Sequence, residues 1–426
     1  MSRRSSALEF LKRVKNSIRR RAELRLDALR LQASMRRHLL RRFGAHGKRI
    51  LVIEDRVPHN YLGSGYPRSN FILWELVRMG YRVTLYPLIF PSEERKSVYD
   101  DIPVEVEVML DLGHDHLASV LRKRKGYYDL IFVSRPDNMA ALSLALPQPN
   151  KIPIVYDAEA LFCMRKIEKA RMMGQPLPPE EAQRLIGEEV RLARDSFCVA
   201  SVSDNEARNF VEHGVRKAYT LSHAVELRPT PKPFAARRDL LFVGPVRVLD
   251  SPNGDAVQWF IREIFPLVRK RLGPDVKFLV AGPNSPEVTG ALAGEAIEFT
   301  GKVDDLTELY DRARLFVVPT RFSAGIPLKI LETASRGLPV VATALVAGQL
   351  GWQHETELLV AHDAEGFAAA CARLYEDGAL WNQLRANALK RVGVDNSPEA
   401  FSTRLRAIIE EALGAEVSET EHLENS

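Results

Sequence analysis

The sequence predicts an α/β protein in which two doubly wound, Rossmann-like domains face a cleft, preceded by a basic helical arm. From Lys48 onward, short apolar segments rich in β-branched residues alternate with stretches in which apolar residues recur at helical spacing. This alternation is typical of parallel sheets covered by helices. The alternation stops once, at the proline-rich segment PTPKPF after Arg228, which indicates a linker. Six strands are predicted on each side of this linker, so each half is expected to form its own sheet.

The N-terminal arm, residues 1–47, differs in charge from the rest of the chain. Residues 1–50 contain 16 Lys and Arg and 3 Asp and Glu, a net charge of +13; the whole chain carries +5, so the remainder carries −8. Residues 7–43 lack Pro and Gly and repeat apolar residues at helical spacing, which predicts a basic amphipathic helix. Such a helix can lie on an anionic membrane surface, or pack on this protein or on a second chain. A nucleic-acid partner is not expected, because the arm lacks interleaved aromatic residues.

Composition favours a cytoplasmic protein, with residues 1–43 as a candidate anchor at the inner face of the membrane. No apolar run reaches the roughly 18 residues that a membrane span needs, and no apolar signal-peptide core is visible. The three cysteines, Cys163, Cys198 and Cys371, are scattered and fit neither a disulfide framework nor a metal site.

The elements follow in order along the chain. In the first half the predicted strands are 49–55, 81–88, 129–135, 153–159, 197–204 and 217–223, with a helix at about 67–79. In the second half they are 239–245, 276–283, 297–303, 314–320, 338–345 and 357–363, with helices at about 254–271, 364–376, 378–391 and 398–413. The expected domains are 48–228 and 238–395, joined by a linker at 229–237 and followed by a helix at 396–413 and a disordered tail at 414–426.

The stretch from Arg314 to Leu345 predicts a ligand site. Two buried strands flank a turn at Gly325 and one helix, a crossover unit whose helix N-terminus faces the carboxyl edge of the sheet, where such sheets bind anions. Lys329 and Glu332 lie on one face of this helix. The cation could hold a phosphate and the carboxylate two sugar hydroxyls; the alternative is a solvated ion pair.

Several other chemistries are disfavoured. The loop Gly63-Ser64-Gly65 lacks the third glycine of a dinucleotide fingerprint and comes late after its strand. There is no Walker A sequence, no G-x-S-x-G elbow and no His/Cys cluster with metal-site spacing.

Longer motifs carry a family resemblance. In the second half they are LLFVGP, SPNGDAVQWFIREIFP, KFLVAGP, FTGKVDDL and YDRARLFVVPTRFSAGIPLKILETASRGLPVVAT; in the first half they are ILVIEDRVPHNYLGSGYPRSNFILWELVRMGYRVTLYP, IVYDAEALFCMR and SVSDNEARNFVEHGV. With these motifs, the chain from Lys48 to about Leu413 resembles a GT-B-fold glycosyltransferase of the retaining group 1 (family 4) superfamily, enzymes of bacterial polysaccharide biosynthesis among them.

The resemblance implies a nucleotide-diphosphate sugar donor on the second domain and a cell-surface polysaccharide or lipid-linked glycan acceptor on the first. It implies no cofactor and no metal, because basic side chains and a helix N-terminus carry the diphosphate charge. The implied donor-binding residues are Glu332 toward the ribose, Lys329 and Arg247 toward the diphosphate, Arg321 as added charge, Gly244 and Gly282 where the backbone approaches the nucleotide, Gly325 at the turn, Gly301 and Val303 at the base, and Gly63, Gly65 and Arg68 near the phosphates. The alternatives are ordinary strand-end turns for Gly244 and Gly282, a surface ion pair for Arg321 and a strand–helix turn for the Gly63 loop.

On the acceptor side, Asp157 and Glu159 end a predicted strand facing the cleft and are the candidate catalytic carboxylates; the alternative is that they cap helices or form ion pairs. His223 ends the last strand of the first half, where a hinge role and a donor contact are equally compatible with the sequence.

Departures from the family pattern leave other functions open. Ala324 replaces the first acid of the family's E-x(7)-E motif, Phe162 stands where relatives often have histidine, and the stretch from Pro245 to Asn253 lacks the usual Lys-Gly. The alternatives are a nucleotide-sugar epimerase of the same fold and a non-catalytic sugar-binding protein.

Overall fold

The structure, a computed structural model, describes residues 47–63, 65–146 and 150–424. The predicted basic helix over 7–43 lies outside the described residues. No helix among the described residues is long and apolar enough to cross a membrane.

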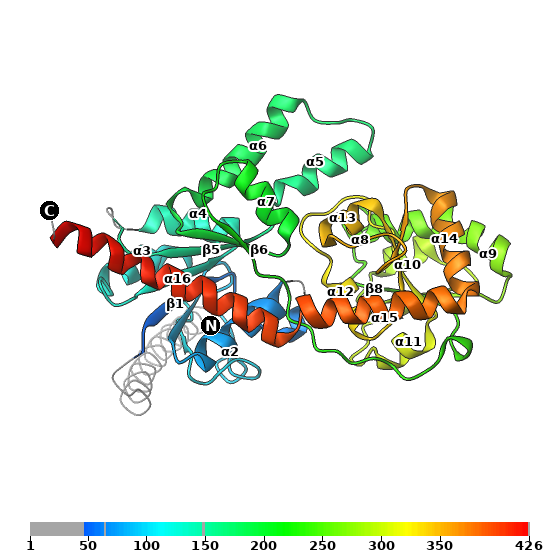
Figure 1. Cartoon of the computed structure of the whole chain (residues 1–426), viewed down its shortest axis with the longest axis horizontal. Helices are drawn as coiled ribbons and strands as arrows, with labels where there is room; N and C mark the ends of the chain where they lie inside the picture. Colours follow the sequence, from blue (N-terminus) through cyan, green and yellow to red (C-terminus); the bar gives the residue numbers. More distant parts are fainter. Residues whose placement is uncertain (1–46, 64, 147–149, 425–426) are drawn as a thin grey trace, which may run out of the picture.

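The N-terminal domain is a parallel sheet in the strand order β3-β2-β1-β4-β5-β6-β7 (Figure 1). Its strands are β1 (Arg49–Glu54), β2 (Arg82–Pro87), β3 (Glu107–Val108), β4 (Leu130–Ser134), β5 (Ile154–Glu159), β6 (Cys198–Ser201) and β7 (Ala218–Thr220). All six predicted strands of this half are present. The additional strand β3 has only two residues, too few for a side-chain pattern to reveal it.

The C-terminal domain repeats this design with the order β10-β9-β8-β11-β12-β13. Its strands are β8 (Leu240–Val243), β9 (Phe278–Ala281), β10 (Ile297–Gly301), β11 (Leu315–Val318), β12 (Val340–Thr343) and β13 (Leu359–Ala361). In both sheets the order reverses beside the first strand, between β1 and β4 and between β8 and β11. Ligands of open α/β sheets bind at such switch points, outside the carboxyl ends of the strands.

Helices cover both faces of each sheet, so the strands read as unbroken apolar runs. In β1, Ile50 and Val52 pack into the core on one face, and Leu51 and Ile53 into the core on the other. The helices of the N-terminal domain are α2 (Tyr66–Arg78), α3 (Gly113–Lys123), α4 (Pro136–Ala145), α5 (Cys163–Met172), α6 (Pro179–Arg191) and α7 (Asp204–Glu212). Those of the C-terminal domain are α8 (Pro252–Trp259), α9 (Phe265–Leu272), α10 (Pro286–Leu292), α11 (Thr307–Arg312), α12 (Leu328–Ser335), α13 (Ala344–Leu350), α14 (Ala364–Glu376) and α15 (Gly378–Asp395). A π-helical turn, Phe260–Ile264, joins α8 to α9 within the single helix predicted at 254–271.

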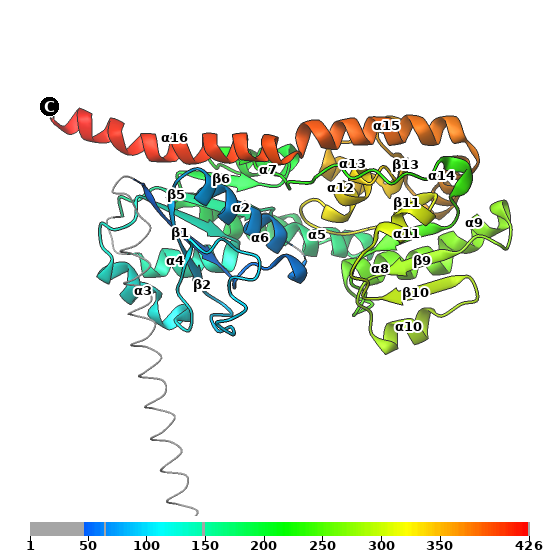
Figure 2. The same cartoon turned by 90° about the horizontal axis from the view of Figure 1, so that it is seen from below.

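The last helix, α16 (Pro398–Glu424), returns to the N-terminal domain. Figure 2 shows α15 and α16 running along one side of both domains. Phe401, Leu405 and Ile409 are buried in the same core as β1 and β2, so the C-terminal segment is part of the N-terminal domain's packing. The helix continues to Glu424, which differs from the expectation of a disordered tail beginning at Gly414.

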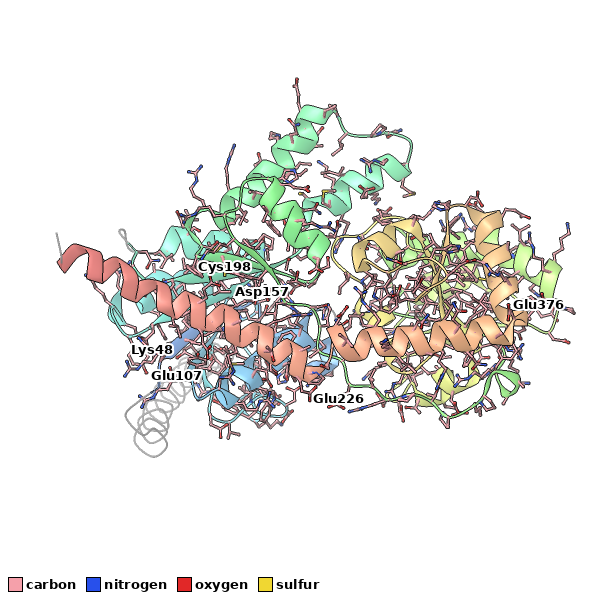
Figure 3. The ribbon with its side chains drawn as sticks, viewed as in Figure 1. Lys48, Glu107, Asp157, Cys198, Glu226 and Glu376 are labelled. Atoms are coloured by element: carbon pink, nitrogen blue, oxygen red, sulfur yellow. The ribbon has the colours of Figure 1, made fainter. Side chains whose placement is uncertain are left out.

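The two domains touch through the turn that precedes α12. The Gly325 N–H donates to Oε1 of Glu206 on α7 (3.2 Å), and the other oxygen of Glu206 accepts from the Leu161 N–H (3.1 Å). A second bridge joins Lys169 Nζ on α5 to Asp250 in the loop after β8 (2.6 Å). These contacts hold the carboxyl edges of the two sheets opposite each other. Figure 3 shows side chains filling the interiors of both domains. It labels Asp157 in the N-terminal domain and Glu226 on the segment that connects the two domains.

Candidate functional site

The predicted turn and helix of the C-terminal domain form as expected. Gly325 has φ +70°, a conformation that favours glycine. Pro327 is the N-cap of α12 rather than its first residue, and the helix begins at Leu328. Its missing N–H is no loss there, because the first N–H groups of a helix lack intrahelical partners. Lys329 therefore stands in the first turn, at the carboxyl edge beside β11.

Lys329 has a neutral hydrogen-bond partner. Its Nζ donates to Oδ1 of Asn253 at 2.6 Å and lies 4.1 Å from the centre of the Phe242 ring. No carboxylate among the described residues lies within ion-pair distance of this ammonium group. Burial lowers the pKa of Lys329 to about 7, against a smaller opposing effect of the Glu332 carboxylate. A cation in this setting gains from an anionic ligand.

Two glycines allow the backbone to come close to this lysine. Gly244 ends β8 with φ +155°, and a Cβ there would lie 3.1 Å from Lys329 Nζ. Gly282 ends β9 with φ +132°, and a Cβ there would lie 2.5 Å from the carbonyl oxygen of Gly244. Side chains at these two positions would close the strand ends, so both glycines keep the edge of the sheet open beside Lys329.

Glu332 lies one turn further along α12 and is exposed in a cavity of about 600 Å³ between the domains. Partial burial raises the pKa of Glu332, with Arg336 and Lys329 acting in the opposite direction. The cavity is also lined by Arg68 and His223 from the N-terminal domain and by Tyr310 from α11. The structure thus brings Glu332, Arg68 and His223, which are distant in sequence, to one cavity.

The remaining donor-site candidates of the C-terminal domain are Arg247, Arg321, Gly301 and Val303; among them the Gly301 carbonyl accepts from the Gly282 N–H at 2.9 Å. Arg247 is exposed in the loop after β8. The Arg321 guanidinium donates twice to the carboxylate of Asp255, at 3.0 and 2.5 Å, and lines a different cavity between the domains. Gly301 ends β10 with φ +70°, and half-buried Val303 follows it.

Arg68 and Asp157 form a buried ion pair in the N-terminal domain. The guanidinium donates to both oxygens of Asp157, at 2.5 and 2.8 Å, and also to the carbonyls of Leu221 and Ser222. Both side chains are completely shielded from solvent. This geometry corrects two expectations. Asp157 is too shielded to meet an acceptor hydroxyl and Arg68 too shielded to meet a phosphate, so the pair anchors the segment after β7 instead.

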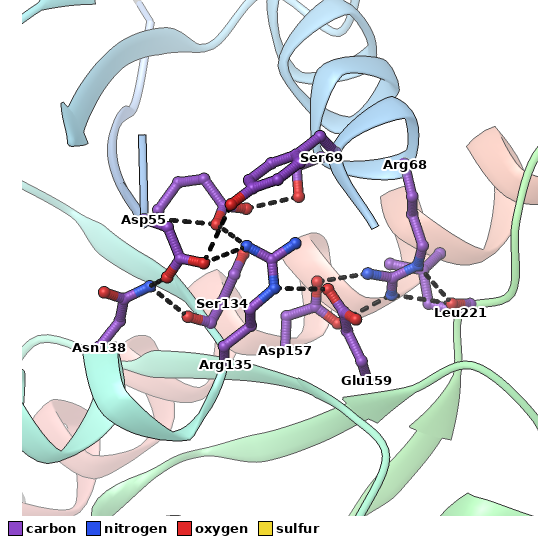
Figure 4. Close-up of polar contacts among 11 residues, drawn as sticks. Asp55, Arg68, Ser69, Ser134, Arg135, Asn138, Asp157, Glu159 and Leu221 are labelled. Atoms are coloured by element: carbon purple, nitrogen blue, oxygen red, sulfur yellow. Dashed lines mark hydrogen bonds and ion pairs between the residues drawn. The ribbon is translucent and has the colours of Figure 1, made fainter. Parts of the chain in front are cut away.

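A second charged cluster surrounds Arg135 at the switch point of the same sheet (Figure 4). Arg135 Nη1 donates to Glu54 at 2.5 Å and to Asp55 at 2.7 Å, and its Nε lies 3.2 Å from Glu159 Oε1. Three carboxylates thus share one guanidinium. Burial raises the pKa of Glu54 to about 7, against the lowering effect of Arg135.

Glu159 and Arg135 face each other in strained conformations. Their φ angles are +61° and +71°, which L-residues adopt at a cost and which occur most often at functional sites. Gly65 packs directly above them, since a Cβ there would lie 2.6 Å from Glu159 Oε1 and 2.8 Å from Arg135 Nη2. The need for glycine at this position therefore arises from the charged cluster. Gly63, with φ +68°, forms the preceding turn.

Sequence reasoning missed Glu54, Asp55, Arg135, Asn253 and Glu206. Glu54, Asp55 and Arg135 stand at or directly after the carboxyl ends of β1 and β4, a position that could have singled them out. Asn253 and Glu206 act across 76 and 119 residues of sequence, and no local pattern marks such partners.

Comparison with known proteins shows what the chain is similar to. Residues 237–377, from the linker to the end of α14, match the family model described as glycosyl transferases group 1. The whole fold is similar to sucrose-phosphate synthase from Thermosynechococcus elongatus, with a TM-score of 0.66, 17% identity and coverage of 86% of this chain and 100% of that one. It is also similar to HepE of Anabaena in complex with UDP, with a TM-score of 0.61, 16% identity and coverage of 85% and 100%.

The chain has the GT-B fold of these glycosyltransferases. Residues 237–377 of its C-terminal domain match the glycosyl transferases group 1 family, in keeping with the resemblance.

Curated relatives match over shorter stretches. An uncharacterized 44.6 kDa protein in the cps region of Klebsiella pneumoniae is 30% identical over 139 residues, 30% of this chain and 35% of that one. An exopolysaccharide phosphotransferase of Streptomyces coelicolor is 27% identical over 215 residues, 47% of this chain and 22% of that one. The chain therefore spans about a third and about a fifth of the lengths of these relatives.

Proposed function

We propose that the protein is a retaining glycosyltransferase that moves a hexosyl or related sugar from a nucleotide-diphosphate sugar to a cell-surface polysaccharide or lipid-linked glycan. The observation that carries this proposal is the edge of the C-terminal sheet. There Lys329 stands in the first turn of α12 beside Gly244 and Gly282, hydrogen-bonded to neutral Asn253 and without a carboxylate partner in the part of the chain that the structure describes. Glu332 is exposed one turn further on, where a carboxylate can accept hydrogen bonds from ribose hydroxyls.

Lys329 would stabilise the departing diphosphate. The lysine is partly buried, so its interaction with a phosphate is stronger than in water, and the N-terminal N–H groups of α12 add to it. Together they supply the charge that a metal ion supplies in other phosphate sites, and we propose that transfer is metal-independent. Arg247 lies on the loop after β8 and is the further cation proposed to approach the phosphates.

On the N-terminal side we propose Glu159 as the carboxylate nearest to the reaction. Its side chain is 15% exposed, whereas that of Asp157 is fully shielded. Burial raises the pKa of Glu159, against the opposing effect of Arg135. An acceptor hydroxyl placed beside Glu159 would be polarised by hydrogen bonding to it.

The comparisons support a nucleotide-sugar donor and a glycan acceptor. HepE of Anabaena was solved with UDP and with UDP-glucose, on the same fold. The two curated relatives are named for a cps region and for exopolysaccharide.

A panel of nucleotide sugars tests the proposal. Purified protein is incubated with each donor and a glycan acceptor, with and without EDTA, and the anomeric configuration of the product is read by NMR. We expect one donor to stabilise the protein thermally and to give a product with the donor's anomeric configuration, at a rate that EDTA leaves unchanged. An epimerised free nucleotide sugar would instead indicate an epimerase, and binding without turnover a non-catalytic protein.

We further propose that residues 1–43 hold the enzyme at an anionic membrane, near a lipid-linked acceptor. The support is the +13 charge of residues 1–50, since each basic residue near such a surface contributes roughly 1 kcal/mol. Co-sedimentation with vesicles of anionic and neutral lipid, at low and high salt, compares the full chain with a chain lacking residues 1–43. Salt-sensitive binding that needs these residues is expected. Binding that survives the deletion or ignores salt would refute the anchor.

A further inference from the structure

His223 is an unsatisfied polar group at the border of the interdomain cavity. The residue is 7% exposed, and its Nδ1 is buried without a hydrogen-bond partner among the described residues. Buried polar groups in native proteins are nearly always paired, so an unpaired imidazole calls for an explanation.

The backbone around His223 is held firmly although its ring is not. Asn396, between α15 and α16, donates to Ser222 Oγ (2.9 Å) and to the His223 carbonyl (3.2 Å), and its own carbonyl accepts from the Val225 N–H (2.7 Å). Arg68 donates to the carbonyls of the two residues just before His223. The ring is therefore positioned by a fixed main chain at the wall of the cavity.

The charges of this cavity suit an uncharged part of a ligand. Its charged lining residues are Arg68, Arg228, Arg336, Glu226, Asp304, Asp305 and Glu332. The formal sum is −1, and Arg68 is in addition neutralised by Asp157. A diphosphate would be disfavoured here, whereas the hydroxyls and carbonyls of a nucleoside would find donors and acceptors. The diphosphate belongs instead beside Lys329.

We propose that His223 is a specificity-determining residue of this site, whose uncharged imidazole hydrogen-bonds the nucleoside part of the donor, its ribose or base. This inference rests on the proposed function. A hydrogen bond from the ligand to the imidazole would give a partner to a side chain that has none among the described residues, and this gain is the reason for keeping a histidine there.

The ring stays neutral across the physiological range. Burial and the neighbouring Arg68 charge lower the pKa of His223 to about 3. The proposed contact therefore does not depend on protonation of the imidazole. Nucleotide affinity can still change with pH, because Glu332 and the phosphates of the ligand also titrate. The effect of removing the ring should be the same at every pH where the protein is folded.

The test compares nucleotide affinities by calorimetry. UDP, GDP, ADP and CDP are first screened with the wild type. The diphosphate that binds most tightly and the corresponding monophosphate are then titrated separately into the wild type and each variant. The variants are His223→Phe, which keeps the volume and removes both nitrogens, and His223→Gln, which keeps a hydrogen-bonding group. His114→Phe, an exposed histidine on α3 far from the cleft, is the control.

We expect His223→Phe to weaken the diphosphate and the monophosphate by the same factor, about 3- to 10-fold, at pH 6 and at pH 8. His223→Gln should recover part of this loss, and His114→Phe should bind as the wild type does. The melting temperature of ligand-free His223→Phe should not fall, because the imidazole is unsatisfied there.

Wild-type affinity in His223→Phe would overturn the inference and leave the proposed function standing, as would a loss confined to the diphosphate. If His223→Phe does not fold, wild-type affinity together with a lowered melting temperature in His223→Gln would give His223 a purely structural role. Failure of every nucleotide to bind the wild type would refute the proposed function, and the inference with it.

Discussion

The carboxyl edges of the two sheets have the same topology and opposite chemistry. In the N-terminal domain most charged groups are paired, Arg68 with Asp157 and Arg135 with Glu54 and Asp55, whereas Glu159 Oε1 lies 3.2 Å from Arg135 Nε without a hydrogen bond among the described residues. In the C-terminal domain Lys329 contacts the Asn253 amide and the Phe242 ring, and none of the carboxylates that the structure describes pairs with it. The switch point collects polar groups in both sheets, but these groups are mostly paired with one another in the first sheet, and they leave a cation without a carboxylate partner, among the described residues, in the second.

This difference separates scaffold from ligand site. A buried ion pair whose hydrogen bonds are complete holds elements together and gains nothing from a ligand. A partly buried cation without a counter-ion has a lowered pKa and is completed by an anion. Stability is therefore assigned to the Arg68–Asp157 pair of the first edge and donor binding to the second edge, and substitutions at these two places should separate the two properties.

The largest effect is expected at the closed edge. Asp157→Asn leaves the Arg68 guanidinium buried without a counter-ion and should lower the free energy of unfolding by about 3–5 kcal/mol. Urea unfolding measures this. Asp137→Asn, an exposed acid in the first turn of α4, is the matched control and should change stability by less than about 1 kcal/mol. A small loss at Asp157 would mean that the pair is dispensable as scaffold.

At the open edge, Lys329→Met should reduce transfer about 100- to 1,000-fold, because one charge on the departing diphosphate is lost. Stability should stay the same or rise, since a partly buried ammonium group no longer has to be desolvated. Steady-state kinetics and thermal unfolding are measured on the same sample. Normal kinetics in this variant, or a loss of activity that merely follows unfolding, would remove Lys329 from the donor site.

Glu332→Gln should have an intermediate effect. An amide accepts weaker hydrogen bonds than a carboxylate, so donor affinity should fall about 10-fold while stability is retained. The decisive reading is which part of the ligand is affected. The substitution should weaken binding of the ribose donor more than binding of the matching 2′-deoxyribose donor. An equal loss of affinity for both donors would place Glu332 away from the ribose.

The bridge between the two edges should matter least. Lys169 and Asp250 lie 2.6 Å apart, but the Asp250 side chain is 79% exposed. Exposed pairs of this kind contribute at most about 1 kcal/mol, so Lys169→Met should change the free energy of unfolding only slightly. A double-mutant cycle with Asp250→Asn isolates the pair, and a coupling well above that value would show that the domains depend on it.

The sequence was informative where local chemistry determines structure. Strands fully covered by helices gave continuous apolar runs, and Gly325, Pro327 and Lys329 marked a turn and a helix start in neighbouring positions. Partners that meet only in the folded chain were invisible. Arg321 looked like a free cation because Asp255 lies 66 residues away, and Asp157 looked like a free carboxylate because Arg68 lies 89 residues away. Residue types at the ends of the strands therefore identified the edges of the sheets. Ion pairs that form only in the folded chain determined which charged side chains remain available to a ligand.

Proton uptake on nucleotide binding tests the central claim most directly. Because the pKa of Lys329 is lowered to about 7, most of the free protein carries a neutral lysine at pH 8, and a bound diphosphate should return the pKa toward its ordinary value. Calorimetric titration of the tightest nucleoside diphosphate, in two buffers of different ionisation enthalpy, counts the protons exchanged. We expect the wild type to take up more protons than Lys329→Met at pH 8, with the difference vanishing near pH 6. Equal proton exchange in both proteins at pH 8 would contradict that claim.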